Sequence, residues 1–151
     1  MRVLSDAGRG WNLFVYGTLR LGEVMAAVAG GVSAGQPAVL EGYRRCRVRG
    51  EAYPGLRRQT GWLTDGILYL GVGGALLRAV DRFEGEEYLR RLVEVRVRAG
   101  ARLPAFVYLT APAFLDRLAD EAWSLEAFRR DGLADFMAGY AGFPFDRTPA
   151  R

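Results

Sequence analysis

Apolar stretches of strand length dominate the first two thirds of this sequence, and few helical stretches separate them. Helices are predicted at residues 24–29, a run of small apolar residues stopped by Gly30-Gly31, and at 75–83, where apolar residues recur at helical spacing. The strand-like stretches are residues 13–16, 39–49, 61–63, 67–72, 93–97 and 105–109. Because strands and helices do not alternate regularly, the pattern favours an α+β fold over a doubly wound sheet.

The last third of the chain differs in composition and is predicted to be helical. Residues 113–122 form one predicted helix, and Ser124 has the chemistry of an N-cap for a second. The apolar face of that second helix holds Leu133, Phe136, Met137 and Tyr140. A stripe of this kind is typical of core packing.

Turn signals and short termini define the predicted domain. Tyr53-Pro54-Gly55 and Thr64-Asp65-Gly66 have the composition of turns. We predict a single domain over residues 12–145, with a core over 12–110 and helices over 112–143, and loose termini at 1–11 and 146–151.

The lack of histidine and the single cysteine exclude several classes of enzyme site. No zinc cluster, no Ser-His-Asp or Cys-His pair and no disulfide within a monomer can be built from this composition. We predict neither a metal nor a cofactor. Cys46 stands between arginines in an alternating pattern, so we interpret it as a buried core thiol of a strand.

The basic residues do not form a binding patch in the sequence. All 21 are arginine, the net charge is +4, and they are scattered among apolar positions. We therefore predict no nucleic-acid partner, although an Arg-rich scaffold for acidic partners stays an alternative. The N-terminus lacks an apolar leader, and no stretch approaches the ~18 apolar residues of a membrane span, so we predict a cytoplasmic protein without membrane contact.

The stretch LFVYGTLR, residues 13–20, breaks an apolar strand at Gly17. A glycine here permits an unusual bend and lets a ligand approach the backbone. The following amides of Thr18, Leu19 and Arg20 then converge, and converging amides bind carboxylates or oxyanions. The alternative is an ordinary strand-ending turn.

A second candidate is Glu84, at the end of the predicted helix and directly before Gly85. If its side chain projects from an apolar wall beside Phe83, burial raises its pKa towards neutrality and makes it useful as a base. The alternative is a surface carboxylate. We expect Asp81, Glu86 and Glu87 to face solvent or to cap the helix.

These segments together resemble the γ-glutamylcyclotransferase-like family, in particular its AIG2-like branch. The resemblance covers roughly residues 12–110. It rests on FVYGTLR followed by Gly22, LEGYRR at 40–45, YPGL at 53–56, GILY at 66–69, VDRFEGEEYLRRLVEV at 80–95 and AFVYL at 105–109.

The resemblance implies a small mixed β-barrel flanked by helices, with a pocket at one end and the C-terminal helices as an addition. The glutamyl carboxylate of a small-molecule γ-glutamyl substrate would be held by the loop of Tyr16, Gly17, Thr18 and Leu19. Glu84 would be the general acid/base. The pocket would be lined by Tyr88 and Tyr108. Arg20 would be the only cation next to the loop. The expected products are 5-oxoproline and a free amine or amino acid, since the substrate's own α-amine supplies the nucleophile.

Two further expectations concern the walls of the pocket and the state of the protein. We expect the outer wall to come from residues 21–37, 53–65 and the C-terminal helices, and both Trp62 and Trp123 to lie in the core. The chain is expected to be a monomer or homodimer. A non-catalytic module that binds a small carboxylate on the same fold is the alternative to the enzyme.

Overall fold

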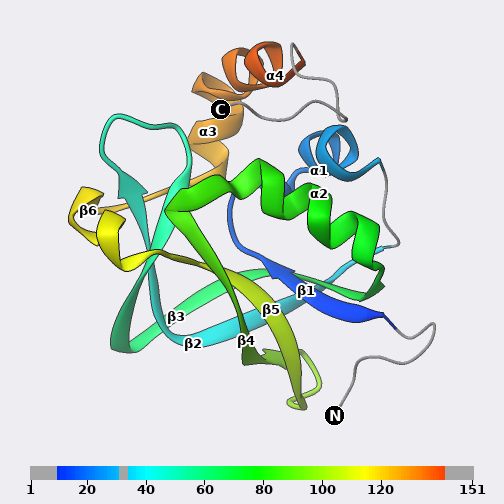
Figure 1. The fold of residues 1–151 in the computed structure, drawn as a ribbon. Helices are drawn as coiled ribbons and strands as arrows, with labels where there is room; N and C mark the ends of the chain where they lie inside the picture. Colours follow the sequence, from blue (N-terminus) through cyan, green and yellow to red (C-terminus); the bar gives the residue numbers. More distant parts are fainter. Residues whose placement is uncertain (1–9, 31–33, 142–151) are drawn as a thin grey trace.

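The computed structural model describes residues 10–30 and 34–141, and the side chains up to residue 138 (Figure 1). The strands are β1 (Trp11–Val15), β2 (Gln36–Val48), β3 (Pro54–Val72), β4 (Tyr88–Val97), β5 (Arg102–Thr110) and β6 (Leu118–Ala122). The helices are α1 (Gly22–Ala29), α2 (Gly74–Glu84), α3 (Leu125–Asp131) and α4 (Leu133–Ala141), with short 3₁₀ helices at Thr18–Arg20, Gly85–Glu87 and Pro112–Arg117.

Five strands close into a mixed barrel. The order is β3-β1-β5-β4-β2, and β2 pairs back onto β3, so these strands form a closed ring. The β1–β5 pairing is parallel and the other pairings are antiparallel, while β6 adds to the free side of β2. Closure removes the exposed edges that an open sheet of this size would present. The predicted mixed β-barrel is confirmed.

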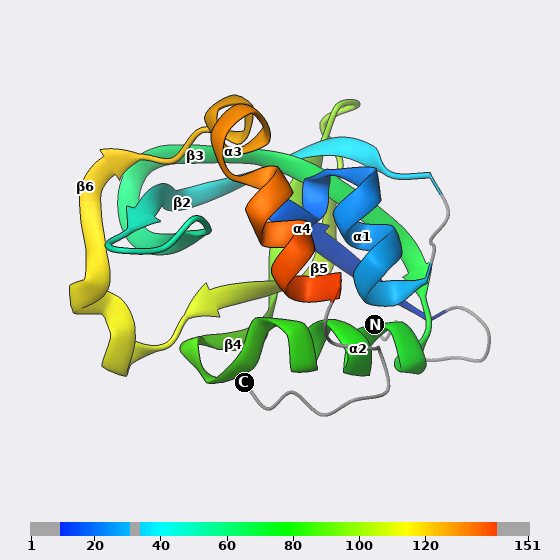
Figure 2. The ribbon, with the colours of Figure 1, turned by 90° about the horizontal axis from the view of Figure 1, so that it is seen from above.

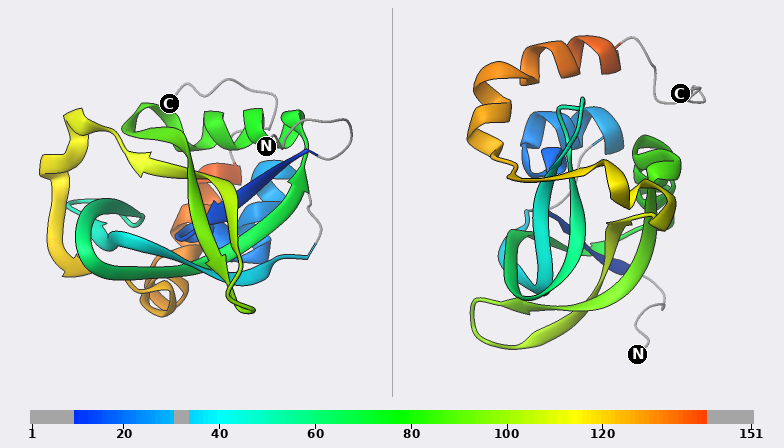
Figure 3. Two further views of the ribbon diagram at one scale, coloured as in Figure 1. Left: turned by 90° about the horizontal axis from the view of Figure 1, so that it is seen from below. Right: turned by 90° about the vertical axis from the view of Figure 1, so that its left-hand side faces the viewer.

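All four α-helices lie at one end of the barrel, as the views in Figures 1 and 3 agree. Seen from that end, α1 and α4 cover the barrel and α2 runs along one side (Figure 2). The side chains of β1 point alternately toward the helices and into the barrel. Leu13 and Val15 pack in the cluster shared with the helices, whereas Phe14 and Tyr16 pack inside the barrel.

The predicted turn at residues 64–66 is wrong, because β3 runs through it without interruption. Thr64, Asp65 and Gly66 pair with residues 40, 39 and 38 of β2. A Cβ on Gly66 would lie 2.3 Å from the carbonyl oxygen of Val15, so the glycine permits close strand packing in the barrel and does not mark a turn. The turn predicted at residues 53–55 also differs from the structure, because β3 begins at Pro54 and continues through Gly55. At the first position of the strand, the missing N–H of Pro54 removes no hydrogen bond from the strand interior.

The predicted helix over residues 113–122 is also wrong. Its first half is the 3₁₀ helix Pro112–Arg117, and its second half is β6. Strand β6 pairs with β2 and buries Leu118 against Cys46 and Val48. Hydrogen bonding to residues 46–48 of β2, which lie beyond its pairing with β4, together with this apolar burial outweighs helix propensity. The prediction that Cys46 is a buried core thiol is confirmed.

The helix predicted after Ser124 begins where it was predicted to begin. The hydroxyl of Ser124 accepts a hydrogen bond from the amide of Ala127 at 3.1 Å, so the predicted N-cap is confirmed. Gly132 divides the segment into α3 and α4, and the apolar face of α4 packs on the core through Leu133, Phe136 and Met137. The side chain of Tyr140 lies outside the described residues.

Two further expectations are settled by burial. Trp123 lies in the core, as predicted, but Trp62 is 43% exposed and carries the Arg44 guanidinium 4.5 Å from its ring centroid.

Strand β1 begins at Trp11, inside the segment predicted to be loose, whereas residues 1–9 and 142–151 lie outside the described part. Among the described helices, none combines the length and hydropathy needed to cross a membrane.

Candidate active site

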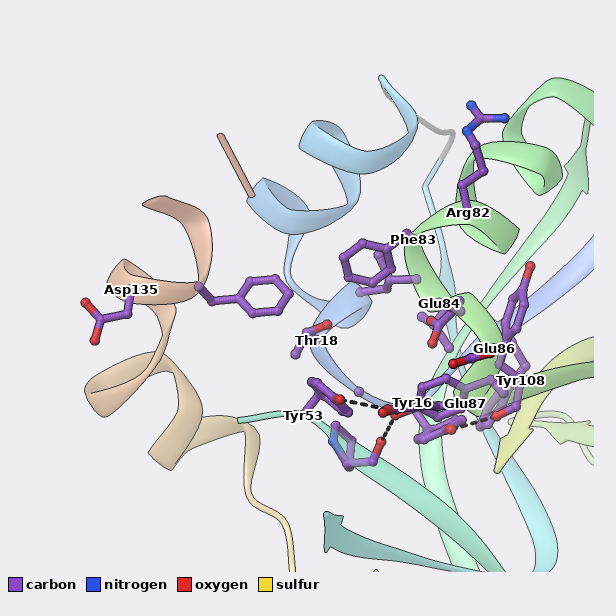
Figure 4. A pocket seen from close by; sticks show the side chains of 18 residues that line it. Tyr16, Thr18, Tyr53, Arg82, Phe83, Glu84, Glu86, Glu87, Tyr108 and Asp135 are labelled. Carbon is purple, nitrogen blue, oxygen red and sulfur yellow. Dashed lines mark hydrogen bonds between the residues drawn. The ribbon is translucent and has the colours of Figure 1, made fainter. Parts of the chain in front are cut away.

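A cavity of about 960 Å³ opens where the end of β1 meets the end of α2 (Figure 4). The described residues that line it are 14–19, 53–54, 82–88, 108 and 135–136. All seven residues predicted from the sequence as site residues therefore lie around one cavity. Figure 4 shows Thr18 and Glu84 approaching this space from different elements.

The loop after β1 is tight because a neighbouring ring presses on it. A Cβ on Gly17 would lie 2.9 Å from Cγ of Pro54, closer than real Cβ contacts allow. The φ of Gly17 is −123°, so no left-handed conformation demands glycine here. Close approach between β1 and the start of β3 is the physical reason for this glycine.

The 3₁₀ turn after Gly17 decides which amides are available to a ligand. The Arg20 amide donates to the Gly17 carbonyl at 3.0 Å, so it lies within the turn, contrary to the prediction that it faces a ligand. The amides of Thr18 and Leu19 come first in the turn and have no acceptor among residues 10–30 and 34–141. Both residues line the cavity, so these two amides are the candidate donors to a ligand there.

Glu84 is the last residue of α2 and lines the same cavity. Gly85 follows with φ +73°, a left-handed conformation that glycine adopts without strain, and this ends the helix at the carboxylate. Burial raises the pKa of Glu84 to about 8, and the negative charges of Asp81 and Glu87 add to the effect. An acid of this kind exchanges its proton near neutral pH.

Four tyrosines brace the cavity through hydrogen bonds to the protein. The hydroxyls of Tyr16 and Tyr88 donate to the carbonyls of Tyr108 and Pro54, each at 2.6 Å. Tyr53 donates to the Glu87 carboxylate at 2.7 Å. Burial is the main cause that raises the pKa of all four phenols, so they stay neutral in the working pH range. These rings shape the cavity and hold its parts in register.

The expectation that Asp81 faces solvent holds only in part, because its side chain is 39% exposed but has partners on β4 and β5. Its carboxylate accepts a hydrogen bond from the Tyr108 hydroxyl and pairs with Arg90 at 2.8 Å. Glu87 is also half-buried, because it binds Tyr53 and pairs with Arg117 at 3.2 Å. Their partners lie on other segments of the chain, so only the acidic composition of residues 81–87 signalled them.

The wall opposite the barrel comes partly from the C-terminal helices. Phe136 of α4 lines the cavity and packs edge-on against Phe83 of α2, with ring centroids 6.0 Å apart. Tyr53 and Pro54 contribute from the predicted segment 53–65. The segment 21–37, expected to form part of the wall, supplies none of the described lining residues.

The arrangement can bind an anionic group and move a proton. Backbone amides of Thr18 and Leu19 are suited to a carboxylate, and Glu84 is suited to proton transfer. Within the described ranges, no three His, Cys, Asp or Glu side chains are grouped to hold a metal ion.

Comparison with known proteins agrees with this geometry. Residues 13–125 match the family model described as gamma-glutamyl cyclotransferase, AIG2-like. The chain is 30% identical over 134 residues to AIG2-like protein C of Arabidopsis thaliana, covering 88% of this chain and 77% of that protein. Matches to four other AIG2 or AIG2-like proteins of the same plant cover 51–54% of their length.

Solved structures show the same fold. An AIG2-like protein from Mus musculus superposes with a TM-score of 0.60 at 26% identity, covering 93% of this chain and 98% of that one. A structure named gamma-glutamyl cyclotransferase has a TM-score of 0.61 at 15% identity, covering 92% and 91%, and this likeness concerns the fold alone.

Proposed function

Because the chain belongs to the gamma-glutamyl cyclotransferase, AIG2-like family, we propose that it cyclises a γ-glutamyl amine or γ-glutamyl amino acid. The products are 5-oxoproline and the free amine or amino acid. The observation that carries the proposal is the meeting of Glu84 with the unused amides of Thr18 and Leu19 around one cavity.

The reaction needs no nucleophile from the protein. The α-amine of the glutamyl group attacks its own γ-carbonyl, the new C–N bond closes a five-membered lactam, and the bond to the departing amine breaks. Intramolecular attack already has a high effective molarity, and a cavity that holds the chain folded back adds to it. A site with neither histidine nor a grouped metal cluster among its described residues is therefore sufficient for this chemistry.

Glu84 has the proton-transfer role. Its carboxylate accepts a proton from the α-ammonium, which frees the amine for attack, and gives that proton to the departing amine as the C–N bond breaks. The ring nitrogen then loses a second proton to Glu84, which passes it to the released amine, so the products are the neutral lactam, an ammonium ion and the regenerated carboxylate. A pKa of about 8 matches this task, because acid and base forms are both accessible near neutral pH. The positive charge of a bound ammonium favours the carboxylate form and so prepares the base.

The amides of Thr18 and Leu19 would hold the substrate's α-carboxylate. Gly17 permits the close approach of the loop to Pro54. The hydroxyls of Tyr16 and Tyr88 fix the surrounding backbone through its carbonyls, and the Tyr108 hydroxyl holds the Asp81 carboxylate. A volume of about 960 Å³ leaves room for the leaving amine beyond the glutamyl group.

A panel of γ-glutamyl amines and γ-glutamyl amino acids, assayed for 5-oxoproline, tests the proposal. We expect Glu84→Gln to lower turnover by about 10²–10⁴-fold with the fold intact, the usual loss for a general acid/base. Glu94→Gln is the matched control, because Glu94 is exposed on β4 outside the cavity and undergoes the same change from carboxyl to amide. An unchanged rate in Glu84→Gln would remove Glu84 from the mechanism.

The same panel separates the enzyme from a binding module. Release of no 5-oxoproline, together with tight binding of a small carboxylate, would favour the non-catalytic alternative. The cytoplasmic location, the lack of nucleic-acid or membrane partners and the monomeric or homodimeric state stay predictions from the sequence.

A further inference from the structure

Two guanidinium groups lie close to the loop that carries the free amides. Arg20 directly follows the loop, and Arg45 reaches it from β2, where its Nη1 donates to the Tyr16 carbonyl at 3.2 Å. The side chains of Arg20 and Arg45 are only 10% and 17% exposed. Arg20 is therefore not the only cation next to the loop, contrary to the expectation from the sequence.

A single carboxylate serves both of these arginines. Asp65 pairs with Arg45 at 2.8 Å and with Arg20 at 3.6 Å, and it is the only acidic partner of either guanidinium in the described part of the chain. The side chain of Asp65 is 71% exposed, so solvent screens its charge more than theirs. The cluster of Arg20, Arg45 and Asp65 consequently holds one surplus positive charge on its buried side.

The electrostatic state of Arg20 reflects this imbalance. Burial and the neighbouring charge of Arg45 lower the pKa of Arg20 to about 10, with Asp65 compensating only in part. Its Nε atom is buried and has no hydrogen-bond acceptor among the described residues. A buried cation with an incomplete set of partners is costly unless a nearby anion offsets it.

We propose that the surplus positive charge held by Arg20 and Arg45 beside the loop strengthens the binding of the ligand's carboxylate at the amides of Thr18 and Leu19. Both arginines are positioning residues in this scheme, because neither lines the cavity and each acts on the bound carboxylate through its charge from beside the loop. Arg45 also orients the loop directly through the Tyr16 carbonyl. The inference rests on the proposed function, since that function places a carboxylate at the loop.

Removal of a positive charge and removal of the negative charge from this cluster should change the affinity for a carboxylate in opposite directions. Arg20→Gln removes a positive charge and should weaken binding of a carboxylate by about three- to tenfold, the range for a charge acting through partly solvated surroundings. Arg20→Lys keeps the charge and should restore most of the affinity. Asp65→Asn removes the counter-charge and should tighten binding, while the Asp65 carbonyl still accepts from Arg45 at 2.8 Å.

Binding of two small lactams tests the inference without turnover. Calorimetric or NMR titration would compare 5-oxo-L-proline with 2-pyrrolidinone, which has the same ring and no carboxylate. We expect the variants to change the affinity for 5-oxo-L-proline and to leave that for 2-pyrrolidinone within about twofold. Arg130→Gln is the control for net charge, because Arg130 is 66% exposed on α3.

The outcomes separate this inference from the proposed function. If the wild-type protein binds neither lactam, the proposed function loses its carboxylate site and the inference falls with it. If 5-oxo-L-proline binds equally to wild type, Arg20→Gln and Asp65→Asn, the inference alone is overturned. Equal weakening of both lactams assigns Arg20 a merely structural role. If Arg20→Gln fails to fold, Asp65→Asn tests the inference in its place. Tighter binding of 5-oxo-L-proline by that variant cannot result from damage to the fold.

Discussion

Replacing Glu84 with Gln should make the protein more stable at alkaline pH. The native carboxyl has a pKa of about 8 against an ordinary value of 4.5. Between these two values the native state binds more protons than the unfolded state, so the stability of the wild-type protein falls as pH rises. Above about pH 8 the loss is complete. Glutamine stays neutral and removes this pH dependence.

The size of the effect follows from the burial of the carboxyl. A rise in pKa from 4.5 to about 8 corresponds to about 5 kcal/mol as an upper limit. The carboxyl is buried, but Glu84 as a whole is partly exposed and lines an open cavity, so water that enters the cavity reduces the cost of the ionised form. We therefore expect Glu84→Gln to gain about 1–3 kcal/mol over wild type at pH 9 relative to pH 5.

Denaturant unfolding at pH 5, 6, 7, 8 and 9 measures this directly. The chain has no histidine, so few other side chains titrate in this window, and burial raises the pKa of the lone thiol, Cys46. Glu94→Gln serves again as the control for loss of one exposed charge. If the curves of wild type and Glu84→Gln stay parallel from pH 5 to 9, the buried, proton-holding state of Glu84 is refuted.

Two substitutions near the cavity complete the predictions. Gly17→Ala places a methyl group 2.9 Å from the Pro54 ring, so it should displace the loop, cost about 1–3 kcal/mol in denaturant unfolding and lower kcat/KM more than kcat. Unchanged kcat/KM would show that the loop tolerates a wider gap. Asp81→Asn removes a negative charge that raises the pKa of Glu84, so the acid limb of the pH profile of kcat/KM should move to lower pH. Tyr108→Phe removes the hydrogen bond that the Tyr108 hydroxyl donates to Asp81 and keeps the Asp81 charge. An equal shift of the acid limb in that variant would contradict the electrostatic explanation.

Patterns among neighbouring residues predicted much of the candidate site. The apolar run ending at Gly17 and the acid at a helix end before Gly85 are features of neighbouring residues, and the motif order identified the family to which the chain belongs. Strand alternation and helical spacing likewise report only which residues share a face within one element. The local signals were sufficient for an α+β fold, for the helices α1 and α2, and for the position of the N-cap Ser124, whereas the mixed barrel was implied by the resemblance to the family.

Tertiary structure decided how these pieces meet. Strand β3 continues through a turn-like sequence because closing the barrel supplies a partner for Thr64 to Gly66, and β6 forms because β2 has a free side. The partners that complete the site are distant in sequence: the Tyr16 hydroxyl binds a carbonyl 92 residues away, and Arg45 reaches the Tyr16 carbonyl across 29. Such contacts depend on the free energy of assembling the whole barrel, which no local periodicity encodes.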